Sequence, residues 1–244
     1  MTILYTSPLF QSSRRPPAYR KMSFRDIPYD IQREIIHTLW HSTSLSTQDR
    51  IIFMTSSTLI SKSWVNIFIR VAYRDIYIPC PSYLNYYLQI LRHDTSTRND
   101  NLRHLSNGLC RTLTFAFDSR NRTSFCLSEL LHSIKVFGTL PHIHTLTIRY
   151  SKISIDDIFD CYQYIDFPDQ IENLEVSLSE TCVGCIQLLR VDPPWHLPHV
   201  RRLSVQGGDE NLVANYLKAC PQLQILKTNC QVKIQDMFIN GWKL

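Results

Sequence analysis

The stretch 143–151, IHTLTIRYS, shows most clearly the pattern that decides the fold. It follows the frame apolar-x-x-Leu-x-apolar-x-x-polar, and alternation at period 2 is typical of a strand with one buried face. The frame returns in four other segments, and a degenerate copy precedes them: 110–118 (CRTLTFAFD), 171–179 (IENLEVSLS), 200–208 (VRRLSVQGG), 223–231 (LQILKTNCQ) and, degenerate, 73–81 (YRDIYIPCP). We expect a short strand in each copy. The leucines predicted to point inward are Leu113, Leu146, Leu174, Leu203 and Leu226.

Helical patterns fill several of the gaps between these strands. They cover 128–137, where Gly138 ends the pattern, 154–165, where Ser154 and Asp157 form a capping box, and 209–219. In three copies a proline comes just before the strand, and a proline cannot continue the preceding helix. We therefore predict a helix-to-strand corner at each of these prolines: Pro141, Pro198 and Pro221. The sequence predicts an α/β fold in which parallel strands alternate with helices.

Strand–helix units that begin 23 to 33 residues apart resemble leucine-rich repeats. Such a unit cannot bury its apolar face alone, so units stack into one continuous core. The resemblance implies a short, irregular solenoid over residues 73–244. This chain departs from the family in its uneven repeat lengths and in the position after the strand, where the family's asparagine is replaced by Asp118, Ser151, Ser179, Gly208 and Gln231. An ordinary α/β domain is the alternative.

Upstream of the strands, the sequence predicts helices. Ile27, Ile31, Ile35 and Leu39 recur every fourth residue, and Ile36 and Trp40 widen this stripe. We expect Asp26 to be the N-cap, with Pro28 in the first turn. Residues 41–48 are polar and look like a loop. A capping box of Ser46 and Asp49 then begins a second, long helical stretch. Its expected apolar face consists of Ile60, Trp64, Ile67 or Phe68, and Val71.

The same residues resemble the F-box over about residues 25–70. The matching segments are Ile27-Pro28-x-Asp30-Ile31, then Ile35-Ile36-x-x-Leu39, then Leu59-Ile60-Ser61-Lys62-x-Trp64-x-x-Ile67. Two departures are Ile27, where the family has leucine, and a longer stretch between Leu39 and Ser61. The longer stretch puts the affinity for the adaptor in doubt more than the fold.

An F-box followed by leucine-rich-repeat-like strands implies a substrate receptor of an SCF-type cullin–RING ubiquitin ligase. The chain would then be a non-catalytic subunit, monomeric within a hetero-complex. It would bind the Skp-type adaptor, and through it a cullin, and hold an unknown protein substrate. The candidate adaptor-binding residues are Ile27, Pro28, Ile31, Ile35, Leu39, Ile60 and Trp64. The alternative is a non-catalytic interaction scaffold that makes no contact with a ubiquitin ligase.

Residues that alternate with the inward leucines should form an open, mixed polar sheet face. Such a face suits protein recognition, in which charge contributes more to specificity than to affinity. The outward positions are Thr114, Ala116, Thr147, Arg149, Glu175, Ser177, Arg202, Ser204, Gln206, Lys227 and Asn229. The candidate substrate-binding residues among them are Arg149, Glu175, Arg202, Gln206, Lys227 and Asn229.

Charge is distributed unevenly along the chain. The formal net charge is +5, and residues 1–25 contain five basic residues and no acid. Residues 26–244 are therefore neutral overall, which favours a protein partner over a nucleic acid. We expect a flexible basic arm at 1–24, F-box-like helices at 25–72 and the repeat-like region at 73–244. The sequence shows no membrane span and no signal peptide, which predicts a cytoplasmic or nuclear protein with its eight cysteines reduced.

Chemistry-bearing residues form no established catalytic pattern, so we expect neither an enzyme nor a cofactor. Cys182-x-x-Cys185 is half of a zinc site or a redox pair, but a second cysteine pair at zinc-site spacing is absent. His142 and His144, on the solvent side of a predicted strand, are too few for a metal site. His37 and His41 have helical spacing without the glutamate of a metalloprotease. Tyr83 and Tyr87 share a helical face and favour packing over ligand stacking.

Overall fold

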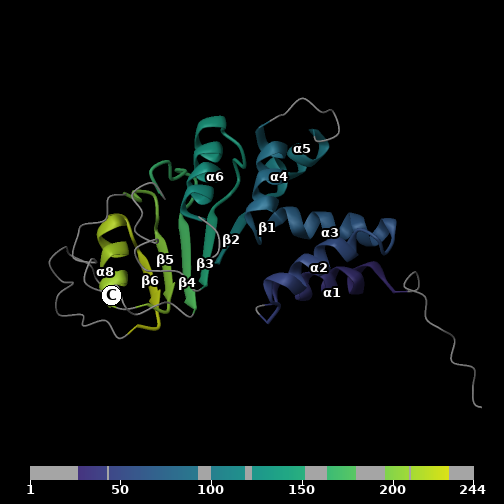
Figure 1. Cartoon of the computed structure of the whole chain (residues 1–244), viewed down its shortest axis with the longest axis horizontal. Helices are drawn as coiled ribbons and strands as arrows, with labels where there is room; N and C mark the ends of the chain where they lie inside the picture. Colours follow the sequence, from purple (N-terminus) through teal and green to yellow (C-terminus); the bar gives the residue numbers. More distant parts are fainter. Residues whose placement is uncertain are drawn as a thin grey trace, which may run out of the picture.

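A computed structural model describes residues 27–42, 44–92, 100–118, 123–151, 164–179, 196–208 and 210–230. Within these ranges the chain is an α/β protein with seven helices and a six-stranded, all-parallel sheet (Figure 1). The helices are α1 (Tyr29–His41), α2 (Thr47–Ser57), α3 (Lys62–Arg74), α4 (Pro81–Arg92), α5 (Asp100–Leu109), α6 (Thr123–Phe137) and α8 (Glu210–Ala219). The strands are β1 (Asp75–Ile78), β2 (Thr112–Asp118), β3 (Thr145–Ser151), β4 (Asn173–Ser179), β5 (Arg202–Gln206) and β6 (Ile225–Thr228).

The sheet confirms the predicted strands and their alternation. The strands lie in chain order, from β1 to β6, and each pairs in parallel with the next. Their register brings the predicted leucines side by side, so that Leu113, Leu146, Leu174, Leu203 and Leu226 form one row across the sheet. The first four are buried, and Leu226 at the last described strand is partly buried against the same core. We call these five residues the leucine row.

The predicted helix-to-strand corners at Pro141 and Pro221 are also confirmed, whereas the segment directly before residue 196, where the helix ahead of Pro198 would lie, is outside the described residues. Each proline lies in a turn that directly precedes a strand. In all three turns a backbone N–H donates across the turn to the carbonyl three residues earlier. These bonds run from Ile143 to Leu140 (3.1 Å), from Val200 to Leu197 (3.3 Å) and from Leu223 to Cys220 (3.2 Å). All six of these residues are buried, so each corner also contributes apolar side chains to the core.

The large hydrophobic core lies between the leucine row of the sheet and helices α4, α6 and α8. Leu84, Leu130 and Val213 lie in the same hydrophobic cluster as the leucine row. The predicted helices at 128–137 and 209–219 are confirmed as α6 and α8. Gly138 ends α6 in the left-handed region, at φ 58°, a conformation that glycine adopts without a steric penalty. The helix predicted at 154–165 lies outside the described residues, as do the basic arm and the segment after residue 230.

The N-terminal helices correct three details of the sequence prediction. Pro28, not Asp26, occupies the N-cap position of α1, and no side chain caps that helix. Thr47, expected in the loop, is already helical, because the Ser46 hydroxyl accepts from the Asp49 N–H at 3.1 Å and starts α2. The prediction of a single long helix after Ser46 is wrong. Residues 58–61 interrupt the helix, and Ser61 caps a separate helix, α3, by accepting from the Trp64 N–H at 3.2 Å.

Candidate docking surfaces

Helix α1 has two apolar sides, one buried and one exposed. One side, with Ile36 and Trp40, is buried in a small cluster with Trp64, Ile67 and Phe68 of α3. The other side carries Ile31, Ile35 and Leu39, whose side chains are 48%, 36% and 38% exposed. We call these three residues the α1 stripe. They follow one another every fourth position, so they lie along a single line on the helix surface.

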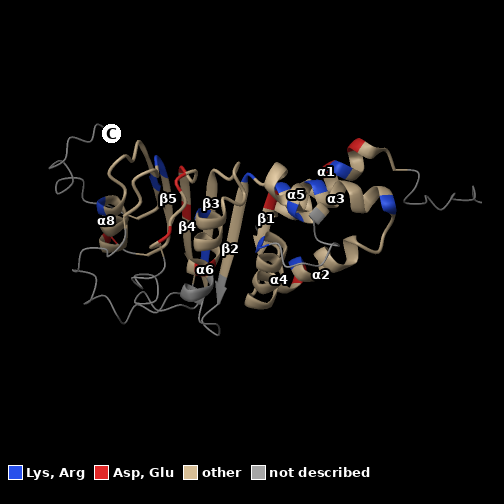
Figure 2. Ribbon diagram, turned by 90° about the horizontal axis from the view of Figure 1, so that it is seen from above, with Lys and Arg blue, Asp and Glu red and all other residues tan. Residues whose placement is uncertain are grey.

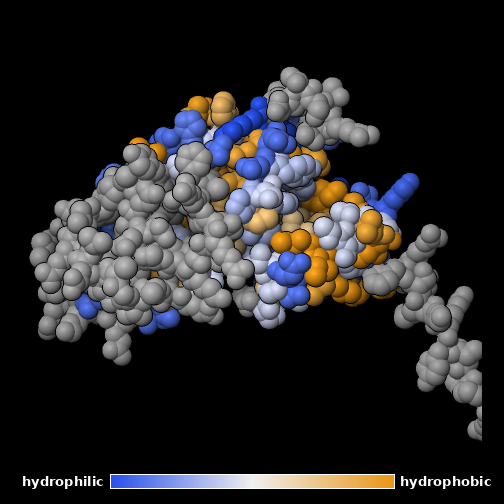
Figure 3. All heavy atoms as spheres, viewed as in Figure 1, coloured by the Kyte–Doolittle hydropathy of each residue, from blue (hydrophilic) through white to orange (hydrophobic). Residues whose placement is uncertain are grey.

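Further large apolar side chains are exposed on the N-terminal helices. Leu59 and Ile60, in the connection between α2 and α3, are 85% and 40% exposed, and Tyr29 and Ile52 are also exposed. Figure 3 shows hydrophobic residues gathered over the N-terminal helices, on the right of the view. Contiguous exposed apolar residues on a folded protein mark interaction sites.

The structure separates the seven candidate adaptor-binding residues into groups. Trp64 is only 3% exposed, so this side chain holds α3 against α1 and is not free to touch a partner. Ile27 is half-buried, and Pro28 is exposed at the start of α1. The prediction that Ile60 shares one helix face with Trp64 is wrong, because Ile60 lies in the connection between two helices, where it is exposed. The α1 stripe is the part that the structure brings together on one element.

The end of α1 is fixed to the first strand. The Trp40 indole N–H donates to the Asp75 carbonyl at 2.7 Å, and His41 Nε2 lies 3.3 Å from Asp75 Oδ2. Burial on its own would raise the pKa of the Asp75 carboxyl. The hydrogen bond and charge of His41, together with Thr112 and Arg74, nevertheless hold that pKa below its ordinary value. The α1 stripe is therefore displayed from a helix whose end is fixed to the sheet.

Arg50 of α2 makes a second attachment, which the sequence patterns do not predict. Its side chain is buried, and its guanidinium donates to the carbonyls of Trp40 and Ser42, the latter at 2.8 Å. The guanidinium carbon also lies 4.3 Å from the centre of the Tyr77 ring, which is within cation–π distance. Burial lowers the pKa of Arg50, the charge of Tyr77 opposes this, and the charge of Arg149 lowers it further. A lone arginine in a polar stretch gives no sequence signal for such a role.

We expect Arg50→Met to lower the free energy of unfolding by about 2–3 kcal/mol. The methionine keeps apolar bulk over Tyr77 but leaves the Trp40 and Ser42 carbonyls without their donor. Urea denaturation followed by circular dichroism measures the change. Arg33→Met removes a charge from the exposed surface of α1 and should alter stability by less than about 0.5 kcal/mol. Equal effects of the two variants would show that Arg50 contributes nothing to the attachment.

Within the part of the chain that the structure describes, the sheet face opposite the leucine row is covered at one end only. The outward side chains Tyr77 of β1 and Ala116 of β2 pack against the small cluster of the N-terminal helices. From β3 onward the outward residues are partly or largely exposed, with the exception of Thr147. The predicted alternation is confirmed here, because the register places Thr114, Thr147, Glu175, Ser204 and Lys227 in one outward row. Arg149, Ser177 and Gln206 lie in the next row.

The six candidate substrate-binding residues differ in how far they are engaged within the chain. Glu175 accepts from the Thr147 hydroxyl at 3.1 Å. Asn229 Oδ1 accepts from the Gly207 N–H at 2.9 Å, so this asparagine ties the turn after β5 to the end of β6. Gln206, Arg202 and Lys227 are exposed, and Arg149 is half-buried. Asn229 therefore has a structural role, and the other five line the open face.

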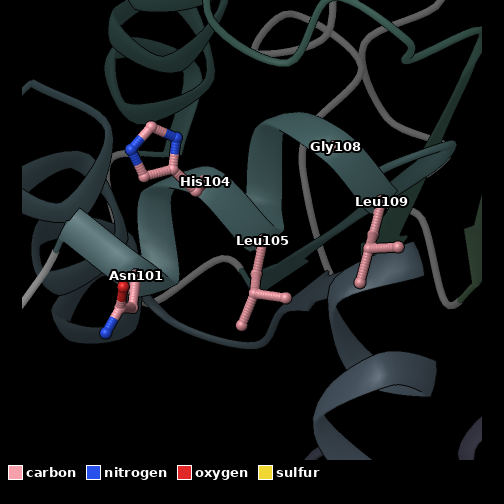
Figure 4. Close-up of a pocket in the computed structure, with 5 residues that line it drawn as sticks. All are labelled: Asn101, His104, Leu105, Gly108 and Leu109. Carbon is pink, nitrogen blue, oxygen red and sulfur yellow. The ribbon is translucent and has the colours of Figure 1, made fainter.

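A pocket beside α5 and two buried thiols are among the described features that bear on reactive chemistry. A shallow pocket of about 540 Å³ lies beside α5, lined by Asn101, His104, Leu105, Gly108 and Leu109. Its one titratable side chain, His104, points away from Leu105 and Leu109 (Figure 4). Within the described ranges, no group of three or more His, Cys, Asp or Glu could hold a metal ion. Burial raises the pKa of Cys110 and of Cys220 to about 12, which keeps both thiols protonated.

The histidines and cysteines of the sequence predictions lie in varied positions. The prediction that His142 and His144 lie on a strand is wrong, because His142 lies in the corner turn and His144 precedes β3. His41 is engaged with Asp75, and its ring centre also lies 4.3 Å from the ring centre of His37. Cys182 and Cys185 lie outside the described residues. Tyr87 is buried in the large core and Tyr83 packs against it, as predicted for packing residues.

Comparison with known proteins returned no matching family model, no matching curated protein and no matching solved structure. None of the helices in the described ranges combines the length and apolar character that a membrane-spanning segment needs.

Proposed function

We propose that this chain is a non-catalytic substrate receptor of an SCF-type ubiquitin ligase. In this proposal the N-terminal helices are F-box-like and dock a Skp-type adaptor, which links the chain to a cullin. The strands form a short leucine-rich-repeat-like arc that holds a protein substrate on its open face. The complex would act in the cytoplasm, the nucleus or both.

The α1 stripe is the observation that carries the proposal. Burying Ile36 and Trp40 satisfies the fold, so the fold does not require Ile31, Ile35 and Leu39 to be apolar. Large apolar side chains displayed at helical spacing suit a partner with a complementary hydrophobic surface. These three residues lie within the segments that resemble the F-box, which gives the adaptor as that partner.

The attachment of the helices to the sheet supports the second half of the proposal. A receptor must hold its substrate at a set position relative to its docking helix. Here Trp40 and His41 at the end of α1 contact Asp75, and Arg50 of α2 contacts Tyr77. Both Asp75 and Tyr77 belong to β1, the first strand of the sheet whose outer face would hold the substrate.

We expect the triple variant Ile31→Ser, Ile35→Ser, Leu39→Ser to lose at least a hundredfold in affinity for a purified Skp-type adaptor. Each apolar side chain buried at an interface is worth about 1–2 kcal/mol, and about 2.7 kcal/mol corresponds to a hundredfold. Isothermal titration calorimetry measures the affinity. The melting temperature should fall by only a few degrees, since the replaced side chains are already partly exposed.

A matched control removes three exposed apolar side chains elsewhere on the surface. Val136, Phe137 and Ile165 are 57%, 56% and 62% exposed, on α6 and in the turn before β4. Replacing all three by serine should leave adaptor binding within twofold of the unmodified chain. If the unmodified chain itself shows no adaptor binding, the ligase assignment fails.

One observation favours the alternative, a scaffold without ligase contact. The helices cover Tyr77 and Ala116 at one end of the sheet face, so they would serve a structural purpose even without an adaptor. In that case affinity purification of the intact chain would recover no adaptor or cullin, while loss of the α1 stripe would still release some other bound protein.

A further inference from the structure

Three basic side chains on the open sheet face have no acidic partner in the described part of the chain. Arg149 of β3, Arg202 of β5 and Lys227 of β6 make no ion pair and no hydrogen bond there. By contrast, Arg92 on the helix side of the sheet is paired with Glu129 at 2.9 Å. Charges that a fold leaves unpaired on one surface create a field that selects a partner of opposite charge.

In the described ranges, a single carboxylate stands among these three cations. Glu175 of β4 shares a row with Lys227, while Arg149 lies one row further along the strands and Arg202 one row back. With strands ~4.8 Å apart and ~3.3 Å per residue, Glu175 is roughly 8–10 Å from each of the three. Figure 2 shows acidic colouring on β4 beside basic colouring on β5.

Glu175 is held in place without being neutralised by a cation. Its carboxylate accepts from the Thr147 hydroxyl at 3.1 Å, and no basic nitrogen in the described residues lies within ion-pair distance of it. The face therefore presents a pattern of charge: positive at Arg149, negative at Glu175, and positive at Arg202 with Lys227. The distance from Arg149 to Arg202 spans two strands and four residues, or roughly 16 Å.

An extended peptide can match this pattern. Residues i, i+2 and i+4 of an extended chain point to the same side and span ~13 Å between the outer two. The distance from Arg149 to Arg202 is longer than this span, and the long side chains at both ends of each ion pair cover the difference. Two acidic residues at i and i+4 would face the cations, and a basic residue at i+2 would face Glu175.

We propose that the open sheet face selects an extended protein segment of the form acidic-x-basic-x-acidic. The occupant is a polypeptide whose outer contacts are carboxylates of Asp or Glu. This inference rests on the proposed function only in taking the sheet face to be the side that holds a protein. It adds the charge pattern of what is held.

The test uses two fluorescein-labelled peptides of the same composition with the full chain. One has the order Gly-Ser-Glu-Ser-Lys-Ser-Glu-Ser-Gly, and the other has the same residues with both glutamates adjacent and the lysine at one end. Fluorescence anisotropy at low ionic strength should show binding of the first peptide at least fivefold tighter than the second. Arg149→Glu, Arg202→Glu, Lys227→Glu together should weaken the first peptide about tenfold, since three exposed ion pairs each contribute modestly.

The control variant carries the same change in net charge elsewhere. Arg33→Glu, Lys62→Glu, Arg70→Glu alters three exposed basic residues of α1 and α3. It should keep the preference for the first peptide. Glu175→Gln should remove the advantage of the central lysine, so that a peptide with serine at that position binds equally well. The double variant Arg202→Glu, Lys227→Glu replaces the triple variant if the latter unfolds.

Three results would contradict the proposal. They are equal binding of the two peptides, equal losses in the sheet-face and control variants, and binding only when phosphoserine replaces both glutamates. Adaptor affinity of the sheet-face variant, measured separately, should stay unchanged. A failure of the charge pattern is thereby distinguished from a failure of the receptor assignment, because adaptor docking depends on the α1 stripe.

Discussion

Trp64→Ala is expected to lower the free energy of unfolding by about 3–5 kcal/mol, the range for deleting a large buried aromatic side chain. Trp64 is 3% exposed and lies in a cluster of only seven buried residues, with Ile36 and Trp40 of α1 on the facing side. A cluster this small has few neighbours that can move into the space. Chemical denaturation with urea, followed by far-ultraviolet circular dichroism, measures the loss.

Ile35→Ala is the control for this prediction. It shortens an apolar side chain on the neighbouring face of α1, where the side chain is already exposed. Its cost in stability should stay below about 0.5 kcal/mol, while its effect on adaptor affinity should be the larger of its two effects. If Trp64→Ala reduced adaptor affinity at full stability, Trp64 would have to contact the partner, and its burial against α1 would not be its main role.

The two apolar faces of α1 show why the sequence could predict the helix but not which face is buried. Ile31, Ile35 and Leu39 repeat every fourth residue, and Ile36 and Trp40 repeat beside them with the same spacing. Periodicity finds both stripes, yet it contains no information about which one a neighbouring helix covers. Tertiary packing determines which stripe is buried, because α3 brings Trp64 and Phe68 to the second stripe only.

Arg50 marks a different limit of sequence reasoning. A buried arginine needs acceptors, and its acceptors here are main-chain carbonyls of Trp40 and Ser42, which every residue possesses. No residue type or spacing therefore points to the contact. The connection between α2 and α3 is also hard to predict. Ser61, which caps α3, belongs to a segment that resembles the F-box, so its residue type alone does not identify the start of a new helix.

The register of the strands, in contrast, is predictable from the sequence. A one-residue shift of any strand would move its leucine from the core to the open face, so a buried face specifies register strongly. The five copies of the frame imply that register from the sequence alone, and β2 to β6 pair accordingly. The same alternation assigns Arg149, Glu175, Arg202 and Lys227 to the outer face. It cannot show that the three cations lack acidic partners among the described residues, because pairing depends on side-chain positions.

Leu174→Ala should cost about 3–4 kcal/mol, whereas Leu226→Ala should cost about 1–2 kcal/mol, although both replace the same residue at the same position of the frame. Leu174 is fully buried, with Leu146 and Leu203 beside it in the row. Leu226 is partly buried at the last described strand, with Leu203 as its one described neighbour in the row. Urea denaturation of the two variants measures the difference, and Glu175→Ala, on the opposite face of β4, should change stability by less than about 0.5 kcal/mol.

Equal costs for Leu174→Ala and Leu226→Ala would contradict this gradient and would mean that Leu226 is covered as completely as Leu174. The gradient follows from the sheet, since each leucine gains its burial from the strands on both sides and β6 has a neighbouring strand on one side only within the described residues. The outer face changes little in either leucine variant, because alternate residues point to opposite sides of a strand. A leucine variant that stays folded should therefore keep the charge pattern of Arg149, Glu175 and Arg202, so the stability of the sheet and the selectivity of its open face can be altered independently.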